Sequence, residues 1–311
     1  MLLERRDVSP NTADNYRQTP LFIAAREGHE GVVKMLLERR DVNPNTADEY
    51  GQTPLFITAR EGHEGVAKIL LERRDVNPNT ANEYGQTPLF IVAREGHEGV
   101  VQMILERRGV EPNAADKDDR TPLFIAGWKG HERVAKMLLK RWDVNPNTAS
   151  KYGQTPLFIA ALEGHEGVVK VLLERRDVAP NTADKDGQTP LFIAGWKGHE
   201  GVAKALLERN DVNPSTVNEH GQTPLLIAAQ QGHERVVKAL LERVDVNSDM
   251  ADLAGQTAFS QARKRGYDSI VELLSEHRSS IPSLDGDRFA TPSTPELSDL
   301  DYRPSKRIRR F

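Results

Sequence analysis

The 311-residue sequence contains no cysteine, and this absence excludes several kinds of site. Disulfides, zinc–thiolate centres, iron–sulfur clusters and cysteine nucleophiles all need a thiol that the chain lacks. Aromatic residues are also scarce, at 6%, and hydrophobic residues reach only 38%. So little apolar material favours a thin, extended core over one large close-packed core.

Long apolar runs and an excess of either charge are missing as well. No segment approaches the roughly 18 apolar residues of a membrane helix, and the start of the chain lacks the apolar core of a signal peptide. The chain has 42 Lys and Arg against 46 Asp and Glu, a net charge of −4. This balance argues against binding of the chain as a whole to nucleic acid or to an anionic membrane. We therefore expect a cytoplasmic protein with no membrane partner.

An internal repeat occupies most of the chain. The tripeptide Thr-Pro-Leu recurs at intervals of 34 residues, at Thr19, Thr53, Thr87, Thr121, Thr155, Thr189 and Thr223. The dipeptide Gly-His recurs in the same register, and an eroded copy of the unit begins at Thr257. The pattern predicts an array of seven full units and a C-terminal capping unit over residues 19–278. Residues 1–18 are then the remnant of a preceding unit and its turn.

Each unit has the pattern of two helices and a turn. In the unit that begins at Thr53, this threonine can cap a helix that has Pro54 at its first position and ends at Gly62. A second helix is expected to begin at His63 and to continue until residues 77–79, Asn-Pro-Asn. Its residues Val66, Ile69, Leu70 and Leu71 form one buried stripe. Residues 82–85 then form a protruding turn, opened by an asparagine and closed by a glycine.

The string Asn-Glu-Tyr-Gly-Gln-Thr-Pro-Leu-Phe, followed by Gly-His and then by Asp-Val-Asn, resembles the ankyrin repeat. The resemblance covers residues 7–277 and implies an all-α solenoid of about eight helix-turn-helix units with protruding turns. Two departures stand out. Phenylalanine, as at Phe56, replaces the family's usual histidine and exchanges a polar bridging group for apolar packing. Arg39-Arg40-Asp41 replaces the glycine that usually follows the second helix.

These departures are similar to those of the near-identical 34-residue arrays that end many large fungal proteins, which often carry an NLR-like nucleotide-binding module upstream. Residues 1–6 also align with residues 35–40, so the sequence begins inside a unit. We expect the chain to be the C-terminal part of a longer protein or a truncated gene product; the alternative is a complete protein. At the other end, Ser260, Gln261, Lys264 and Arg265 provide the polar surface expected of a capping unit.

No pattern of residues predicts catalysis. The His-Glu pairs, such as His29-Glu30, resemble half of a His-Glu-X-X-His zinc motif, but the second histidine is missing. Equivalent histidines on adjacent units are expected roughly 8–10 Å apart, too far apart to share a zinc ion. We expect each histidine to bridge the turn between its two helices instead. The sequence thus predicts no enzyme activity, no cofactor, no metal site and no small-molecule ligand.

Function is expected where the copies differ, because the scaffold is constant. The ankyrin resemblance implies that the turns and the first helices line a concave binding face, and two variable positions fall there: the turn tip and the end of the first helix. The candidate partner-binding residues are Trp128, Trp196, Tyr50, Tyr84, Tyr152, Leu162, Arg60 and Arg94. Alternatively, each of the two tryptophans folds back over the glycine before it, and the tyrosines only stiffen their turns. Trp142 follows a second helix, and we expect it to pack within its loop.

The leading functional prediction is a non-catalytic scaffold that binds a protein or peptide on its concave face. One alternative is the sensing arm of a larger, nucleotide-dependent, NLR-like regulator. Another is a nuclear regulator that acts through residues 279–311, a segment rich in Ser, Pro and Asp that we expect to be disordered. This segment ends in a basic cluster that could direct nuclear import: Arg303, Lys306, Arg307, Arg309 and Arg310.

Overall fold

The computed structural model describes residues 9–280, which form sixteen helices and no strand. The first helices of the units are α1 (Pro20–Arg26), α3 (Pro54–Glu61), α5 (Pro88–Glu95), α7 (Pro122–Lys129), α9 (Pro156–Leu162), α11 (Pro190–Lys197), α13 (Pro224–Gln231) and α15 (Ala258–Arg265). The second helices are α2 (Glu30–Glu38), α4 (Glu64–Glu72), α6 (Glu98–Glu106), α8 (Glu132–Leu139), α10 (Glu166–Leu173), α12 (Glu200–Leu207), α14 (Glu234–Leu241) and α16 (Asp268–Ser280).

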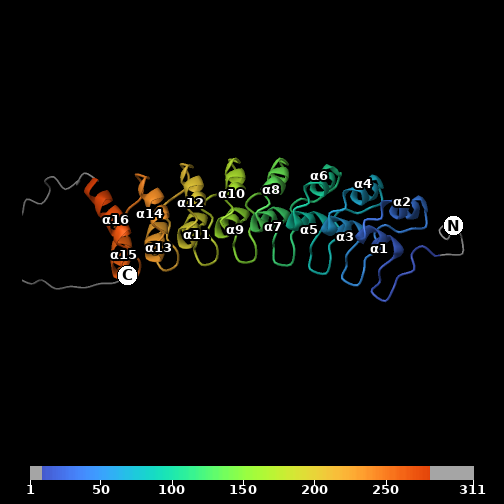
Figure 1. Ribbon diagram of the computed structural model, residues 1–311, viewed down its shortest axis with the longest axis horizontal. Helices are drawn as coiled ribbons and strands as arrows, with labels where there is room; N and C mark the ends of the chain where they lie inside the picture. Colours follow the sequence, from blue (N-terminus) through green and yellow to red (C-terminus); the bar gives the residue numbers. More distant parts are fainter. Residues whose placement is uncertain (1–8, 281–311) are drawn as a thin grey trace, which may run out of the picture.

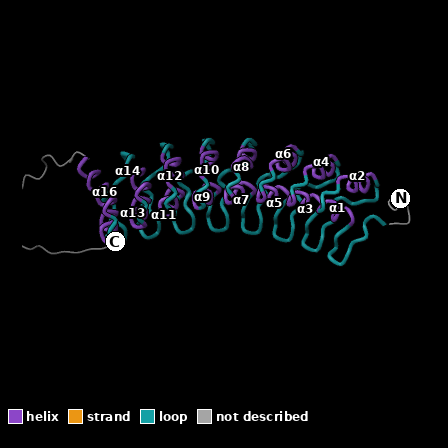
Figure 2. The backbone as a smooth tube through the Cα atoms, viewed as in Figure 1, coloured by secondary structure: helices purple, strands orange, loops and turns teal. Residues whose placement is uncertain are grey.

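The helix pairs stack in chain order and form two parallel rows (Figure 1). The odd-numbered helices form an inner row, and the even-numbered helices form an outer row. Long loops extend from the inner row on the side away from the outer row (Figure 2). Because the stack bends gently, the inner row and its loops lie on the concave side. The all-α solenoid that the sequence predicts is confirmed.

The inner helices begin and end where the sequence predicts. In α3 the Thr53 hydroxyl accepts a hydrogen bond from the backbone N–H of Phe56, at 3.2 Å, and Pro54 is the first helical residue. The helix ends at Gly62, whose φ of 79° suits glycine. Glycine is needed here for a second reason, because a Cβ at this position would lie 2.7 Å from the ring of His97 in the next unit.

The outer helices end earlier than the sequence suggests. Helix α4 ends at Glu72, and Arg73 is already extended, with a ψ of 132°, so the prediction that the helix continues to residues 77–79 is wrong. The Arg73 side chain accounts for the early end, since it binds Asp75 and also reaches the backbone of the preceding unit. The start is close to the prediction: His63 precedes the first helical residue, Glu64.

The core is a thin slab between the two rows. Phe56 and Ile57 from the inner helix and Val66 and Leu70 from the outer helix are almost completely buried. Each such side chain contributes roughly 1.5–3 kcal/mol through burial, and equivalent residues recur unit after unit. Phe56 has apolar neighbours throughout, which confirms the apolar packing expected of the phenylalanine substitution.

The last unit differs from the others in its helix start. Ser260 and Thr257 form a reciprocal capping box, in which each side chain accepts a hydrogen bond from the other residue's backbone N–H. Lys264 and Arg265 are exposed as expected of a cap, but Gln261 is buried against the array. Its outer helix, α16, has 13 residues and is longer than the outer helices before it.

Candidate binding surface

One register position, at the end of the inner helix, combines a fixed backbone with a variable side chain. Its occupants along the array are Arg26, Arg60, Arg94, Trp128, Leu162, Trp196 and Gln230. The histidine of the following unit places Nε2 at 2.9–3.1 Å from the backbone carbonyl oxygen of each of the first six. A carbonyl oxygen only accepts, so Nε2 is the donor. The expectation that each histidine bridges the turn of its own unit is therefore wrong: its imidazole reaches back to the preceding unit.

Three consecutive units carry apolar side chains at this position: Trp128, Leu162 and Trp196. Leu162 is half-buried against a small cluster of Phe158, Phe192, Ile193 and Ile227. Trp196 keeps 40% of its surface as a residue exposed. The ammonium group of Lys197 lies 4.5 Å from the centroid of the Trp196 ring. We call these three residues the apolar centre of the inner face.

Trp128 is more deeply packed than Trp196. Its ring meets Phe124 of the same helix edge-on, with 6.3 Å between the centroids, and the guanidinium of Arg120 lies 5.7 Å from its centroid. The glycine before each tryptophan admits the next inner helix, because a Cβ at Gly127 would lie 3.0 Å from the carbonyl oxygen of Pro156. Close packing between units therefore explains the glycine without an indole folded over it.

The arginines at the same position are tied to neighbouring side chains. Arg60 pairs with Glu61 at 2.9 Å and donates to the side-chain oxygen of Gln52 at 3.2 Å. Arg94 pairs with Glu95 at 2.8 Å. These exposed pairs largely neutralise their own charge and contribute little to stability.

The turn tips form a second line along the inner side. Most turns are held by an Asx residue, as where Asp48 accepts from the backbone N–H groups of Tyr50 and Gln52, at 3.0 and 2.8 Å. Ser150 takes this place in the turn of Tyr152. The turns are also linked to one another, since the N–H of Glu83 donates to the carbonyl oxygen of Tyr50 at 2.9 Å. Neither set of hydrogen bonds uses a tyrosine side chain. The rings of Tyr50, Tyr84 and Tyr152 are exposed.

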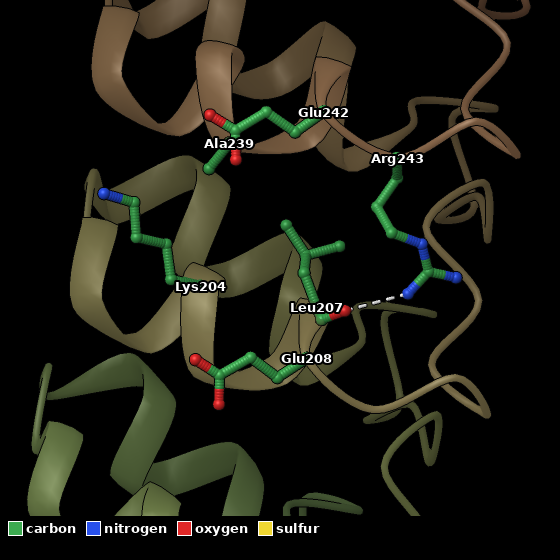
Figure 3. Close-up of a pocket in the computed structure, with 6 residues that line it drawn as sticks. All are labelled: Lys204, Leu207, Glu208, Ala239, Glu242 and Arg243. Atoms are coloured by element: carbon green, nitrogen blue, oxygen red, sulfur yellow. Dashed lines mark hydrogen bonds between the residues drawn. The ribbon is translucent and has the colours of Figure 1, made fainter.

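An arginine bridge between the outer helices was not predicted from the sequence. In the second unit Arg73 binds Asp75 through Nε and Nη2, at 2.9 and 2.5 Å, and donates from Nη1 to the carbonyl oxygen of Leu37 at 2.7 Å. Helix α2 thus gains a partner for one of its terminal carbonyl groups, which have none within the helix. Figure 3 shows the equivalent bond from Arg243 to Leu207, 3.0 Å long, beside a pocket between α12 and α14. The recurring Arg-X-Asp pattern was the available signal.

Trp142 follows α8 on the outer side, far from the apolar centre. This residue is 92% exposed, so the expectation that it packs within its loop is wrong. The preceding residue explains this orientation: Arg141 turns inward to Asp143 and to the carbonyl oxygen of Leu105. Trp142 is consequently a second exposed tryptophan, on the opposite row from Trp196.

An asparagine ladder links the loops behind the outer helices. It was not predicted from the sequence. Asn45 donates from Nδ2 to the carbonyl oxygen of Asp75 at 2.6 Å, and its Oδ1 accepts from the N–H of Asn77 at 2.8 Å. The histidine, arginine and asparagine contacts all cross from one unit to its neighbour. Together they fix the spacing of the side chains on the inner face.

Three further features bear on function: metal-binding clusters, membrane-spanning helices and the basic cluster near the end of the chain. Within residues 9–280, no cluster of three or more His, Asp or Glu side chains could hold a metal ion. No helix in this described part is long and apolar enough to cross a membrane. The basic cluster Lys306, Arg307, Arg309 and Arg310 and most of the predicted tail lie outside the described residues.

Comparison with known proteins identifies the family. The family model for ankyrin repeats matches the sequence in four overlapping segments, residues 1–82, 74–149, 142–216 and 206–285. The comparison with curated proteins found no match. Ankyrin repeats are generally protein-binding scaffolds and are typically non-catalytic. With its paired helices, capped inner helices and family match over most of its length, the chain belongs to the ankyrin repeat family.

Proposed function

We propose that this chain is a non-catalytic scaffold that binds a protein or peptide partner on its concave inner face, at the apolar centre. One observation carries the proposal. At a single register position, three consecutive units place Trp128, Leu162 and Trp196 where the units before them place arginines. The carbonyl groups of these residues are held like those of the arginines, so only the exposed chemistry changes.

The apolar centre has the properties of a binding hot spot. Tryptophan buries a large area at a small cost in conformational entropy and is enriched among residues that dominate binding energies. Trp196, which is 40% exposed, still has surface to bury against a partner. Lys129, Glu163 and Lys197 follow the three apolar residues and supply a mixed-charge edge. An apolar centre with a polar rim is the usual arrangement of a protein interface.

The positions on either side extend the proposed surface. Tyr50, Tyr84 and Tyr152 on the turn tips, with Arg60 and Arg94 at the helix ends, give a partner similar contacts at successive units. An extended or repetitive partner gains avidity from such a series, because each contact after the first is intramolecular. We therefore infer a partner segment that runs along the array rather than a compact ligand in one pocket.

The test is affinity capture from the source cell with the full chain as bait. The informative variant is Trp196→Ala, because its ring is exposed, and the matched control is Trp142→Ala on the outer row. Both variants are first shown to have the circular dichroism and urea midpoint of the parent. The proposal expects Trp196→Ala to lose the partner and Trp142→Ala to retain it. Equal capture by all three proteins, or loss only with Trp142→Ala, would refute it.

Two other roles remain predictions from the sequence alone. As the sensing arm of an NLR-like nucleotide-dependent regulator of the fungal type, the array would be joined to an upstream module; a continuous transcript that encodes such a module would support this role. A nuclear regulator acting through residues 303–311 would lose nuclear accumulation when these residues are deleted. Neither role conflicts with partner binding on the inner face, which is the activity that either would use.

A further inference from the structure

The turn tips of the first three units differ in chemistry from those of the middle units. Tyr16, Tyr50 and Tyr84 occupy three successive tips, and all three rings are exposed. The tips are joined, since the N–H of Glu49 donates to the Tyr16 carbonyl oxygen at 3.1 Å and that of Glu83 to the Tyr50 carbonyl oxygen at 2.9 Å. We call Tyr16, Glu49, Tyr50, Glu83 and Tyr84 the tyrosine–glutamate strip.

The rings of the strip are open to a cation, whereas the inner-face aromatic rings of the middle units are already covered. The ammonium group of Lys151 lies 5.0 Å from the centroid of the Tyr152 ring. Lys197 covers Trp196 in the same way at 4.5 Å. Within the described residues, no Lys or Arg side chain lies over Tyr16, Tyr50 or Tyr84 at such a distance.

The strip also carries negative charge without a paired cation. Glu49 and Glu83 are exposed, and neither forms an ion pair among the described residues. Glu49 raises the pKa of Tyr50 through its negative charge and hydrogen bonding. Hydrogen bonding to Glu83, with its charge, raises the pKa of Tyr84. Each of these carboxylates therefore acts on the hydroxyl group of the tyrosine beside it.

Most positive groups near the strip are paired, but Lys117 lies beside Tyr84, since its N–H donates to the Tyr84 carbonyl oxygen at 3.0 Å. Arg26, Arg60 and Arg94 at the helix ends are paired with Glu27, Glu61 and Glu95. Arg17 follows Tyr16 and weakens the negative potential at that end, so the strip is centred on Tyr50 and Tyr84. Beyond Tyr84 the sign reverses, because Lys117, Lys151 and Lys185 precede the next three tip residues.

We propose that the tyrosine–glutamate strip binds a basic peptide segment of the partner, with a Lys or Arg over each tyrosine ring and beside each carboxylate. An exposed aromatic face attracts a cation, and the adjacent carboxylate adds Coulomb attraction. The inference rests on the proposed function and specifies the chemistry of one end of the partner.

The spacing of the units predicts the spacing of the cations. Neighbouring packed helices lie roughly 8–10 Å apart. A peptide in the polyproline II conformation repeats every three residues, over roughly 9 Å. Cations at every third position of such a peptide would therefore meet successive tips. The expected recognition pattern is a basic residue, two residues of any kind, and another basic residue.

Fluorescence anisotropy with labelled synthetic peptides tests the inference on the full chain. The probe is four copies of Lys-Pro-Ser, and the matched peptides are four copies of Glu-Pro-Ser and a peptide of the probe's composition with its lysines adjacent. Binding of the Lys-Pro-Ser probe is expected to exceed both. Tyr50→Ala/Tyr84→Ala is expected to weaken it roughly tenfold, and Glu49→Gln/Glu83→Gln to weaken it and to reduce its salt dependence.

Trp142→Ala is the matched control, because it removes an exposed aromatic ring on the outer row, away from the strip, and it should leave probe binding within twofold of the parent. The inference is overturned if the lysine and glutamate peptides bind equally. It is also overturned if removing Tyr50 and Tyr84 changes nothing, or if Trp142→Ala weakens probe binding as much.

The chain's own basic cluster could compete for the strip, since Arg303, Lys306 and Arg309 are themselves spaced by three residues. The titration is therefore repeated on a full-length variant in which Arg303, Lys306, Arg307, Arg309 and Arg310 are replaced by glutamine. Probe binding that appears only in this variant, and that requires Tyr50 and Tyr84, supports the strip and identifies the cluster as its competitor. Absence of probe binding to either protein overturns the inference.

Failure of the strip and failure of the proposed function give different results. Capture that depends on Trp196, without preference for the lysine probe, leaves the proposed function and refutes the strip. If the probe binds through Tyr50 and Tyr84 but partner capture does not depend on Trp196, the strip is supported and the proposed function is refuted.

Discussion

The Nε2 atom of His233 lies 3.0 Å from the backbone carbonyl oxygen of Trp196, a residue of the preceding unit. The same relationship joins His199 to Leu162 and His165 to Trp128. A constant histidine thus holds the backbone at the position where the side chain varies most. Under the proposed function, each of these residues has two parts: its carbonyl group belongs to the array, and its side chain contributes to the surface offered to a partner.

This arrangement predicts that the histidine bridge stabilises the array. His97→Ala removes the donor to the Arg60 carbonyl oxygen, 3.1 Å away, and leaves space beside Gly62. We expect a loss of about 1–2 kcal/mol, measured as a lower midpoint of urea unfolding. His220→Ala is the control, because that histidine is exposed at a turn tip, and it should leave the midpoint almost unchanged.

The arginine bridge is incomplete in one unit, and completing it should stabilise the chain. Arg107 has Gly109 where the other units have an aspartate, and its buried Nε atom has no hydrogen-bond partner. Gly109→Asp should provide the missing carboxylate and raise stability by about 0.5–1 kcal/mol, provided that residue 109 leaves its φ of 80°. Gly109→Ala measures the backbone effect alone; an aspartate no better than alanine would contradict the prediction.

The same aspartates predict a loss of stability in acid. The pKa values of Asp75, Asp143, Asp177, Asp211 and Asp245 are lowered, first by the hydrogen bond from the arginine two residues earlier. A carboxyl group that binds its proton more weakly in the folded chain stabilises the fold above its ordinary pKa of about 3.9. That contribution is lost as the pH falls through the lowered folded value.

Asp184 has the opposite effect on stability in acid. Burial raises its pKa, so its protonation in acid favours the folded chain. Because the aspartates with a lowered pKa outnumber Asp184, the urea midpoint should fall as the pH falls below about 5. Replacing Asp75 and Asp177 by asparagine should make the fall shallower. A midpoint independent of pH between 7 and 3 would show that the pairs do not contribute.

The two inner tryptophans should differ in their effects on stability. Trp128 packs on Phe124 and under Arg120, whereas Trp196 has no such aromatic neighbour among the described residues. Trp128→Ala is expected to cost about 1–2 kcal/mol, and Trp196→Ala less than about 0.5 kcal/mol. Urea unfolding of both variants measures the difference. Equal losses would mean that Trp196 is also a packing residue.

Local chemistry made much of the fold predictable. Thr53 as a cap, Gly62 as a helix end and the Asx turn at residues 82–85 each depend on a few adjacent residues, and all three are found. The early end of α4 could not be predicted in this way, because Arg73 finds one of its acceptors in the preceding unit, at Leu37. The acceptor of the histidine side chain could not be predicted for the same reason, because it also lies in the preceding unit.

The sequence indicated which inner-helix position varies, but not how far each side chain at that position is exposed. Trp128 and Trp196 stand in the same local sequence, Phe-Ile-Ala-Gly-Trp-Lys-Gly-His-Glu. They differ because the turn before α7 supplies Arg120 to the Trp128 ring, while the equivalent residue before α11 is Gln188. Trp142 shows the same limit, since its exposure follows from the inward turn of Arg141.

Oxidative footprinting of the complex with the captured partner tests the central claim most directly. Of the two exposed tryptophans, Trp196 lies in the inner helix α11 and Trp142 follows the outer helix α8, so each reports on its own face of the unaltered chain. If the partner binds the concave inner face, hydroxyl-radical oxidation of Trp196 should fall on complex formation while that of Trp142 stays at its value in the free chain. Protection of Trp142 with unchanged oxidation of Trp196 would place the partner on the outer row and contradict the account.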